Sequence, residues 1–307
     1  MELRFNFNVF QINLYIAFLL KIPTLYSTQT ILTSNAQPIL HMSLRISALA
    51  SWSTGNVTYI ETETTKILLD AWLSGKKIEQ SLNNLNRKIE EISNIFITHE
   101  HIDHIRSAGI LNRRFGTKII GNEKTLSSSG FFTATKRDNP YGKEFLEPGK
   151  AMRVGDIEVK AFKTSHDTVC SQFYTFKHQE KKIACLTDTG NITPEMIEEI
   201  KDSNILLIES NHDVDMLKHG SRPESNKQRI LSNHGHLSNV QCAEYLSQII
   251  TPRTHTIILG HLSHDHNTKE LAYETISSHL EKYHQNLRKN LHLFVADADE
   301  NSTLLEA

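Results

Sequence analysis

Three histidines and one aspartate lie within six consecutive positions of this 307-residue chain, directly after a short apolar run. The segment reads Ile95-Phe96-Ile97-Thr98-His99-Glu100-His101-Ile102-Asp103-His104. Because residues i and i+2 of an extended segment share a side, His99 and His101 can face one point. Asp103 and His104 lie where the loop turns into a helix and can face a second point nearby. The spacing therefore predicts two neighbouring binding points.

Imidazole and carboxylate groups in this order suit a pair of divalent metal ions. Two metals about 3.5–4 Å apart form a recurring hydrolytic arrangement that polarises a substrate and activates water. Nitrogen and oxygen donors favour zinc or manganese, and no cysteine is nearby to indicate a structural thiolate site. The alternative is a histidine-rich surface turn, which rarely has the order HxHxDH behind an apolar strand. We expect two divalent ions, Zn²⁺ or Mn²⁺.

The HxHxDH element resembles the signature of the metallo-β-lactamase superfamily. In that family a histidine, a bridging aspartate and a last histidine complete the site, in this chain order. The matching positions each follow an apolar run and are His166 in Thr164-Ser165-His166-Asp167, Asp188 in Leu186-Thr187-Asp188-Thr189-Gly190, and His261 in Leu259-Gly260-His261-Leu262. Ligands at strand ends are what a rigid, preformed site needs.

The resemblance implies how the ligands divide between the two metals. One metal takes His99, His101 and His166. The other takes Asp103, His104 and His261, and Asp188 bridges the two. Asp70, at the end of its own strand, is expected to orient a ligand imidazole without binding metal.

Further motifs resemble a narrower branch, the YycJ/WalJ-like bacterial cytoplasmic metallohydrolases, which are similar to 5′→3′ DNA exonucleases. They are Ala50-Ser51-Trp52-Ser53-Thr54-Gly55-Asn56, Leu69-Asp70-Ala71-Trp72-Leu73, Glu209-Ser210-Asn211-His212-Asp213, Gly235-His236-Leu237-Ser238-Asn239 and Leu259-Gly260-His261-Leu262-Ser263. The resemblance covers essentially Ser43 to Leu305. Trp52 and Trp72 depart from it, because glycine is expected there, and we expect them near the mouth of the site. His264 and His266 are expected in a polar surface loop.

Glu209 and His236 follow a strand signal and precede a helix signal, respectively. In related tRNA 3′-processing endonucleases, a glutamate and a histidine in such places assist departure of the leaving oxygen. An imidazolium held by a carboxylate is a reasonable proton donor to a developing alkoxide. The alternative is that both residues only cap their elements. Together with Asp103, they are our expected catalytic residues. His212 stays open between packing and substrate contact.

The resulting expectation is a metal-dependent hydrolase, specifically a phosphodiesterase that acts on DNA in the manner of a 5′→3′ exonuclease. A thioesterase or lactonase of the same fold is one alternative. A non-catalytic, metal-binding accessory protein of cell-wall signalling is another, although a complete ligand set argues against it. The net charge of −2 gives no global attraction to nucleic acid. The basic cluster 222–229 reads as a solvated helix face unless the fold brings it to a groove.

Composition and length indicate one α/β enzyme domain over 42–307, preceded by an extension. Residues 1–41 are expected to be poorly ordered, or to precede the true start codon. Within them, the apolar run 9–20 is too short to span a bilayer, and a weak export signal is the alternative. Three widely spaced cysteines favour a reducing cytoplasm over a disulfide framework. We expect no membrane association, and the oligomeric state is left open.

From Leu44 onward, strand and helix signals alternate. Expected strands are 44–50, 57–61, 66–70, 95–97, 152–154, 157–162, 173–176, 183–186, 205–208 and 256–259. Expected helices are 76–91, 102–115, 194–200, 227–231, 238–249 and 269–282. The irregular region 123–148 is long enough to form a flap over the site. Two β-rich halves with outer helices predict an α+β fold, the four-layer αββα metallo-β-lactamase sandwich, with metals at one edge between the sheets.

Overall fold

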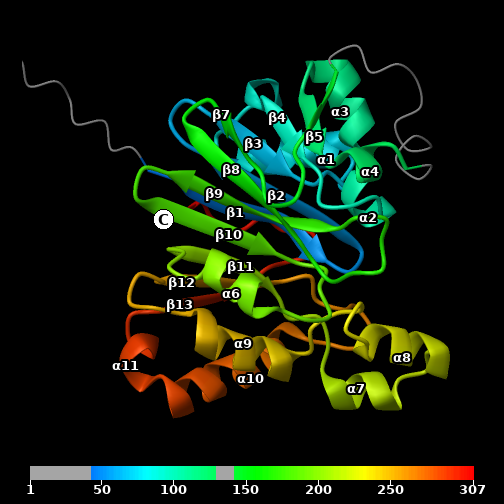
Figure 1. Ribbon diagram of the computed structural model, residues 1–307, viewed down its shortest axis with the longest axis vertical. Helices are drawn as coiled ribbons and strands as arrows, with labels where there is room; N and C mark the ends of the chain where they lie inside the picture. Colours follow the sequence, from blue (N-terminus) through cyan, green and yellow to red (C-terminus); the bar gives the residue numbers. More distant parts are fainter. Residues whose placement is uncertain (1–42, 129–141) are drawn as a thin grey trace, which may run out of the picture. The chain divides into compact units, whose positions relative to one another are not determined.

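The computed structural model describes residues 43–128 and 142–307, which form two stacked mixed sheets with helices on their outer sides (Figure 1). The first sheet has the order β14-β1-β2-β3-β4-β5-β6 and the second has the order β13-β12-β11-β10-β9-β8-β7. This arrangement confirms the predicted αββα sandwich. The expectation for residues 1–41 lies outside the described residues.

The strands of the first sheet come mainly from the amino-terminal half of the described chain. They are β1 (Arg45–Trp52), β2 (Gly55–Glu61), β3 (Lys66–Leu69), β4 (Asn94–Phe96), β5 (Lys118–Gly121), β6 (Lys143–Phe145) and β14 (Leu305–Glu306). The second sheet contains β7 (Ala151–Val154), β8 (Ile157–Lys163), β9 (Gln172–His178), β10 (Lys181–Leu186), β11 (Ile205–Glu209), β12 (Thr256–Gly260) and β13 (His292–Val295).

The helices cover the outer faces of both sheets. Beside the first sheet lie α1 (Gly75–Asn84), the 3-10 turn η2 (Ile89–Glu91), α2 (Ile102–Ile105), α3 (Ala108–Phe115) and α4 (Glu123–Leu126). The second half of the chain adds α6 (Pro194–Ile200), α7 (Val214–His219), α8 (Glu224–Leu231), α9 (Asn239–Ile249), α10 (Lys269–Tyr283) and α11 (Gln285–Arg288).

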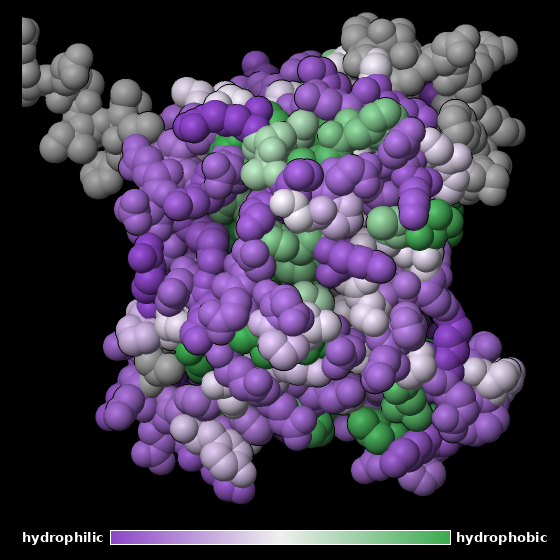
Figure 2. Space-filling view, viewed as in Figure 1, coloured by the Kyte–Doolittle hydropathy of each residue, from purple (hydrophilic) through white to green (hydrophobic). Residues whose placement is uncertain are grey.

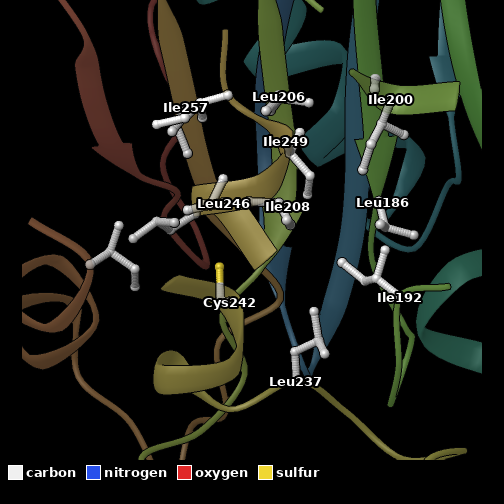
Figure 3. Close-up of a cluster of buried hydrophobic side chains, with 14 of the residues drawn as sticks. Leu186, Ile192, Ile200, Leu206, Ile208, Leu237, Cys242, Leu246, Ile249 and Ile257 are labelled. Carbon is white, nitrogen blue, oxygen red and sulfur yellow. The ribbon is translucent and has the colours of Figure 1, made fainter. Parts of the chain in front are cut away.

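Three apolar clusters hold these layers together. One fills the space between the sheets, where Phe96 meets Tyr174 and Phe176 edge to face. A second joins the second sheet to α6, α9 and α10 (Figure 3). The third joins the first sheet to α1 and α3. Because β11 and β12 are buried on both faces, their sequences read as nearly continuous apolar runs. The face in Figure 2 is largely hydrophilic, with hydrophobic residues in small, separate groups.

Two segments expected as single helices are divided in the structure. The segment 76–91 ends its α-helix at Asn84, and Asn86 takes the left-handed conformation (φ 58°) before η2 begins. The segment 102–115 breaks between α2 and α3. Backbone hydrogen bonds tie this break to the loop after β3, from Ala71 N to His104 O at 2.6 Å and from Ser107 N to Ala71 O at 2.7 Å. The break is a tertiary effect that helical periodicity does not predict.

Several short elements were not predicted, because each has too few residues to show a periodic pattern of apolar side chains. They include strands β5, β6, β13 and β14, and helix α7. The irregular region expected as a flap begins with α4 and continues into β6, and its middle, 129–141, lies outside the described residues. Within the described chain, none of the helices combines the length and apolar character that a bilayer crossing requires.

Candidate metal centre and active site

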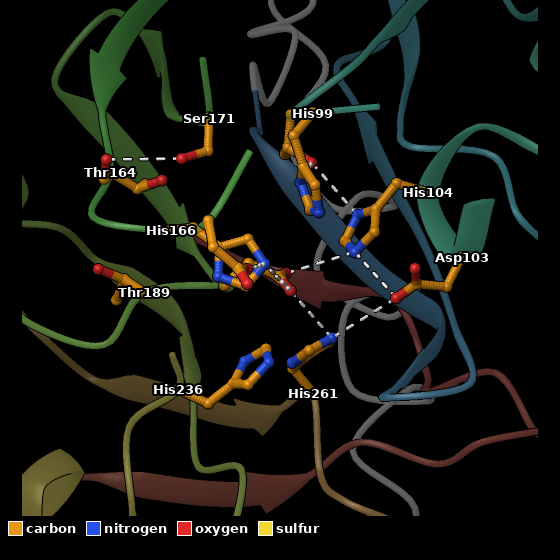
Figure 4. Close-up of polar contacts among 12 residues, drawn as sticks. His99, Asp103, His104, Thr164, His166, Ser171, Thr189, His236 and His261 are labelled. Atoms are coloured by element: carbon orange, nitrogen blue, oxygen red, sulfur yellow. Dashed lines mark hydrogen bonds and ion pairs between the residues drawn. The ribbon is translucent and has the colours of Figure 1, made fainter. Parts of the chain in front are cut away.

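The seven expected metal ligands converge at one edge of the sandwich, and both sheets contribute (Figure 4). His99 and His101 follow β4, and Asp103 and His104 lie in α2. The other three follow strands of the second sheet: His166 after β8, Asp188 after β10 and His261 after β12. The side chains face one another because parallel and neighbouring strands end at the same edge.

The distances reproduce the expected division into two groups. Donor atoms of His99, His101 and His166 all lie within 4.8 Å of one another, as do those of Asp103, His104 and His261. Asp188 lies between the groups: its Oδ1 is 3.2 Å from Nε2 of His261 and 3.8 Å from Nε2 of His166. Its Oδ2 is 3.4 Å from Nε2 of His104. One carboxylate thus faces ligands of both groups.

Several strand ends at the site have a left-handed backbone. Asp70 (φ 59°), Asp188 (φ 57°) and His261 (φ 54°) each follow a buried strand and are not glycine. Non-glycine residues in this region cost of order 1 kcal/mol or more, and such strain concentrates at functional sites. The sharp turn at each position directs a functional side chain back across the strand end.

Hydrogen bonds outside the cluster fix the direction of the imidazoles. His104 donates from Nδ1 to Asp70 (2.7 Å), as predicted, and His261 donates from Nδ1 to Glu209 (2.9 Å). His166 donates from Nδ1 to the Gly235 carbonyl (3.2 Å). Each bond uses Nδ1 as the donor, which leaves Nε2 as the nitrogen available to a metal.

The inward-facing atoms fit a divalent cation. Nε2 of His99, Nε2 of His261 and Oδ2 of Asp188 are buried and have no hydrogen-bond partner among the described residues. Burial lowers the pKa of His99 well below its ordinary value, which keeps it neutral. Burial opposes a charge on Asp188 as well, but His261 and His104 hold its pKa well below the ordinary range. Burial would lower the pKa of His104 and His261 too, but Asp188 and neighbouring carboxylates raise the pKa of His104 well above its ordinary value and that of His261 to about 10. A divalent ion would take the place of these protons, because metal ligands must be deprotonated.

Glu209 and His236 form a pair beside these ligands. His236 donates from Nδ1 to Oε1 of Glu209 at 2.7 Å, and its ring centroid lies 5.0 Å from that of His166. The same Oε1 accepts the bond from His261, while Oε2 accepts from the amides of Thr189 (3.0 Å) and Leu237 (3.3 Å). These bonds occupy both oxygens of the fully buried Glu209, so it positions the imidazoles instead of binding a metal.

A cleft of about 210 Å³ opens over this arrangement, and His101, Asp103, Asp188, His236 and His261 line its floor. A neighbouring cavity of about 680 Å³ shares only His166 with the lining of this cleft and extends toward α6. We assign the chemistry to the smaller cleft because five of the seven expected ligands, together with His236, line it.

The two tryptophans differ from our expectation, because neither lines this cleft. Trp52 donates to the Ala296 carbonyl and packs on the core of the second sheet. Trp72 packs on the third core cluster and occupies the space that a Cβ at Gly55 would need, at 1.8 Å. Both serve packing at the site's periphery.

Two further histidines also differ in part. His264 is exposed, as expected, but His266 is buried against Gly220 and Ser263. His212 is fully buried and packs beside the Glu209 pair, and burial lowers its pKa to about 4. It does not line the cleft, which favours packing over substrate contact.

Comparison with known proteins agrees with this geometry. Residues 65–262 match the family described as the beta-lactamase superfamily domain. The chain belongs to the metallo-β-lactamase superfamily. Within the superfamily it is similar to exodeoxyribonuclease WalJ of Streptococcus pneumoniae, with 43% identity over 239 residues, 78% of this chain and 89% of that protein. It is also similar to exodeoxyribonuclease YycJ of Bacillus anthracis, with 41% identity over 242 residues, 78% of this chain and 90% of that protein.

The fold is shared with solved structures of the superfamily. The metallo-β-lactamase fold protein YhfI of Bacillus subtilis superposes with a TM-score of 0.64 over 86% of this chain and 100% of that chain, at 12% identity. The expected family and its YycJ/WalJ-like branch are therefore confirmed, and the chain is a metal-dependent hydrolase.

Sequence reasoning missed part of the surrounding shell. The second bond of Glu209, to His261, was not foreseen, nor was the amide of Asn56, which lies 3.2 Å from Nε2 of His104. Asn56 belongs to a motif that carried the resemblance, so a signal for it existed. The contact of Glu209 depends on strand register, which a single sequence does not specify.

Proposed function

We propose that this protein is an exodeoxyribonuclease that hydrolyses phosphodiester bonds of DNA with two divalent ions, Zn²⁺ or Mn²⁺, proceeding 5′→3′. The observation that carries the proposal is the Glu209–His236 pair beside the metal cluster. Expulsion of a sugar alkoxide requires a proton donor, whereas amide, thioester or lactone hydrolysis can draw a proton from water. The names of the two bacterial relatives support the same substrate class.

The seven clustered side chains would hold the metals in the expected groups. His99, His101 and His166 would bind one ion, Asp103, His104 and His261 the other, and Asp188 both. When bound, the ions supply positive charge for the non-bridging oxygens and make water a stronger nucleophile. Besides acting as a ligand, Asp103 reaches the cleft with a partly exposed carboxylate and can orient the attacking water there.

His236 performs the proton transfer in this proposal. Its Nδ1–H is held by Glu209, so the ring cannot rotate, and its other nitrogen faces the cleft. Burial alone would raise the pKa of Glu209, but His236 and His261 lower it to about 2, so it stays ionised and holds the Nδ1–H of His236. His236 then donates its proton from Nε2 to the leaving oxygen.

The free state of Cys170, Cys185 and Cys242 supports the cytoplasm as the compartment in which this enzyme works. DNA is the proposed partner.

A substrate panel tests the proposal. Metal-loaded protein is incubated with single- and double-stranded DNA labelled at the 5′ or 3′ end, a thioester and a lactone. Early release of the 5′ label as mononucleotide is expected, with both carbonyl substrates intact. Hydrolysis of thioester or lactone with DNA untouched would contradict it. The control Asp188→Asn, whose amide tolerates the left-handed backbone, should lose metals and every hydrolytic activity together.

A further inference from the structure

One side of the active-site cleft is formed by a helical hairpin that contributes no metal ligand. The hairpin consists of α7 and α8, and Arg222, Asn226 and Arg229 line the cleft together with the clustered histidines. The basic cluster 222–229 is therefore more than a solvated helix face. Three donor side chains without any assigned role border the place where the reaction occurs.

The hairpin is held firmly against the active site. The Ile230 carbonyl accepts the backbone N–H of His236 at 3.0 Å, which ties the end of α8 to the proton donor. A Cβ at Gly235 would lie 2.2 Å from that carbonyl, so this close approach requires glycine. Lys227 donates to the Lys218 carbonyl (2.7 Å) and joins α8 to α7. The arginines are thus presented from a fixed platform.

Each arginine is oriented by a carboxylate next to a metal ligand. Arg229 bonds through Nε and Nη2 to Asp167, the residue after His166. Arg222 bonds through Nη2 to Asp265 at 2.7 Å, in the loop after His261. The two anchors lie on opposite sides of the ligand set along the second sheet, so the guanidinium groups are held at separate points of the rim.

The carboxylates reduce the net charge of the rim but leave most donors available. A guanidinium presents a fork of several N–H groups, and Asp167 and Asp265 use only one edge of each. The remaining guanidinium donors of Arg222 and Arg229, and the side-chain amide of Asn226, have no partner among the described residues. Both arginine side chains are about half exposed, at 41% and 53%. Oriented, hydrated guanidinium groups are the usual partners of phosphate oxygens.

We propose that Arg222, Asn226 and Arg229 form a subsite for the DNA backbone, binding the non-bridging oxygens of phosphates that flank the scissile bond. This inference rests on the proposed nuclease function and extends it to substrate positioning. A minimal diester with a single phosphate does not reach the subsite, whereas a DNA strand does.

The test compares DNA with bis(p-nitrophenyl) phosphate, which has no flanking phosphate, in Arg222→Ala and Arg229→Ala. We expect kcat/KM for DNA to fall about 10–100-fold, mainly through KM, and at least tenfold more than the rate on the small diester. The slope of log kcat/KM against log salt should become shallower by about one per arginine. Arg229→Lys should keep the salt slope and recover part of KM.

Arg253→Ala is the matched control. Arg253 is an exposed arginine that precedes β12, whereas the active site follows β12. The strand between them is roughly 17 Å long. Its removal deletes the same charge and should leave both substrates and the salt slope unchanged. A parental DNA rate and salt slope in Arg222→Ala and Arg229→Ala would overturn the subsite. Equal losses on both substrates would also overturn the subsite, because they would show that the arginines act on the reacting phosphate itself.

Binding of fluorescently labelled DNA, measured by anisotropy, separates this proposal from the proposed function. If the parent protein cleaves no DNA yet binds it, and the affinity and salt slope fall in both arginine variants, the nuclease assignment fails and the subsite stands. If the parent cleaves DNA and both variants bind it like the parent, the subsite fails and the nuclease assignment stands.

Discussion

At the scale of single residues, the active site depends on which nitrogen of each imidazole faces inward. Asp70, Glu209 and the Gly235 carbonyl each accept a hydrogen bond from Nδ1 of one of the clustered histidines. His99 donates to Thr98, whose hydroxyl donates to Asp70. Side chains that bind no metal therefore determine the tautomers on which metal binding depends.

The first prediction concerns His236 as the proton donor. His236→Ala should keep both metals and slow DNA cleavage by about 10²–10⁴-fold, because the leaving alkoxide loses its acid. With a p-nitrophenolate leaving group, already stable as an anion, most of the defect should disappear. Single-turnover rates and metal content by elemental analysis provide the measurements. If His236→Ala cleaved DNA at the parental rate, His236 would not be the proton donor and would only help to start the helix that follows it.

The second prediction concerns the double role of Glu209. Because it holds both His236 and His261, Glu209→Ala should weaken metal binding by about 10–100-fold and slow the chemical step. At saturating metal, its defect should not add to that of His236→Ala, since both remove one proton-transfer unit. Metal titration of the single and double variants tests this. Additive losses of activity in the double variant would show that Glu209 and His236 do not act as one proton-transfer unit.

At the scale of elements, a buried carboxylate joins the strands β1 and β2 to the turn before η2. Glu61 is fully buried and accepts hydrogen bonds from Arg87 at 2.6 and 2.8 Å, from Arg45 at 2.7 Å and from Tyr59 at 2.6 Å. Burial alone would raise the pKa of Glu61, but Arg87, Tyr59 and Arg45 lower it. This network is far from the ligands in sequence and orders the sheet that supplies four of them.

The third prediction is that Glu61→Gln lowers the free energy of unfolding by about 3 kcal/mol at pH 7, because the partly buried Arg45 and Arg87 lose their counter-charge. The folded pKa lies below the unfolded one, so this contribution is complete above about pH 4.3 and lost as pH falls through the folded pKa. Urea unfolding between pH 7 and pH 3 should show the difference shrink. Glu63→Gln, which removes the more exposed partner of Arg45, is the control, with a change within about 0.5 kcal/mol. An equal effect of both substitutions would contradict the network.

At the scale of the whole domain, the expected metal ligands come from both sheets, because α2 and the loop after β4 face the loops that follow β8, β10 and β12. The fourth prediction is that chelation lowers the melting temperature by roughly 10–20 °C, since each of the two sites filled at 100 Kd adds about 2.7 kcal/mol. Differential scanning with and without chelator gives the shift. Asp188→Asn should already melt at the lower temperature and not respond to chelator.

The fifth prediction concerns the amino-terminal extension. A chain that begins at Met42 should keep its melting temperature and its DNA cleavage rate within about twofold, because the first strand begins at Arg45 and its pairings lie within the later chain. Loss of soluble protein on truncation would show that the extension packs on the domain. Recovery of a processed form outside the cytoplasm would instead support an export signal.

The sequence by itself, through its apolar patterns and the resemblance of its motifs, determined the fold and located the residues that cluster, because each lies within a few positions of a strand end or opens a helix. His99, His101, His166, Asp188 and His261 are tied to apolar runs whose periodicity is local. Local patterns of this kind can be recognised in a sequence without knowing which strands pair with one another in the sheet. Asp70 was also correctly assigned for this reason, since it ends a strand beside the HxHxDH loop.

Only the tertiary structure decided the contacts that depend on strand register and loop direction. Glu209 reaches His261 because β11 pairs in parallel with β12, placing Glu209 opposite Gly260. The hairpin of α7 and α8 brings Arg222 and Arg229 to the cleft because buried His266 and Gly235 fix its two ends. Trp52 and Trp72 are partly buried and pack against the cores instead of lining the cleft, although their sequence positions placed them beside the site. Such outcomes follow from packing between distant segments, which no local period encodes.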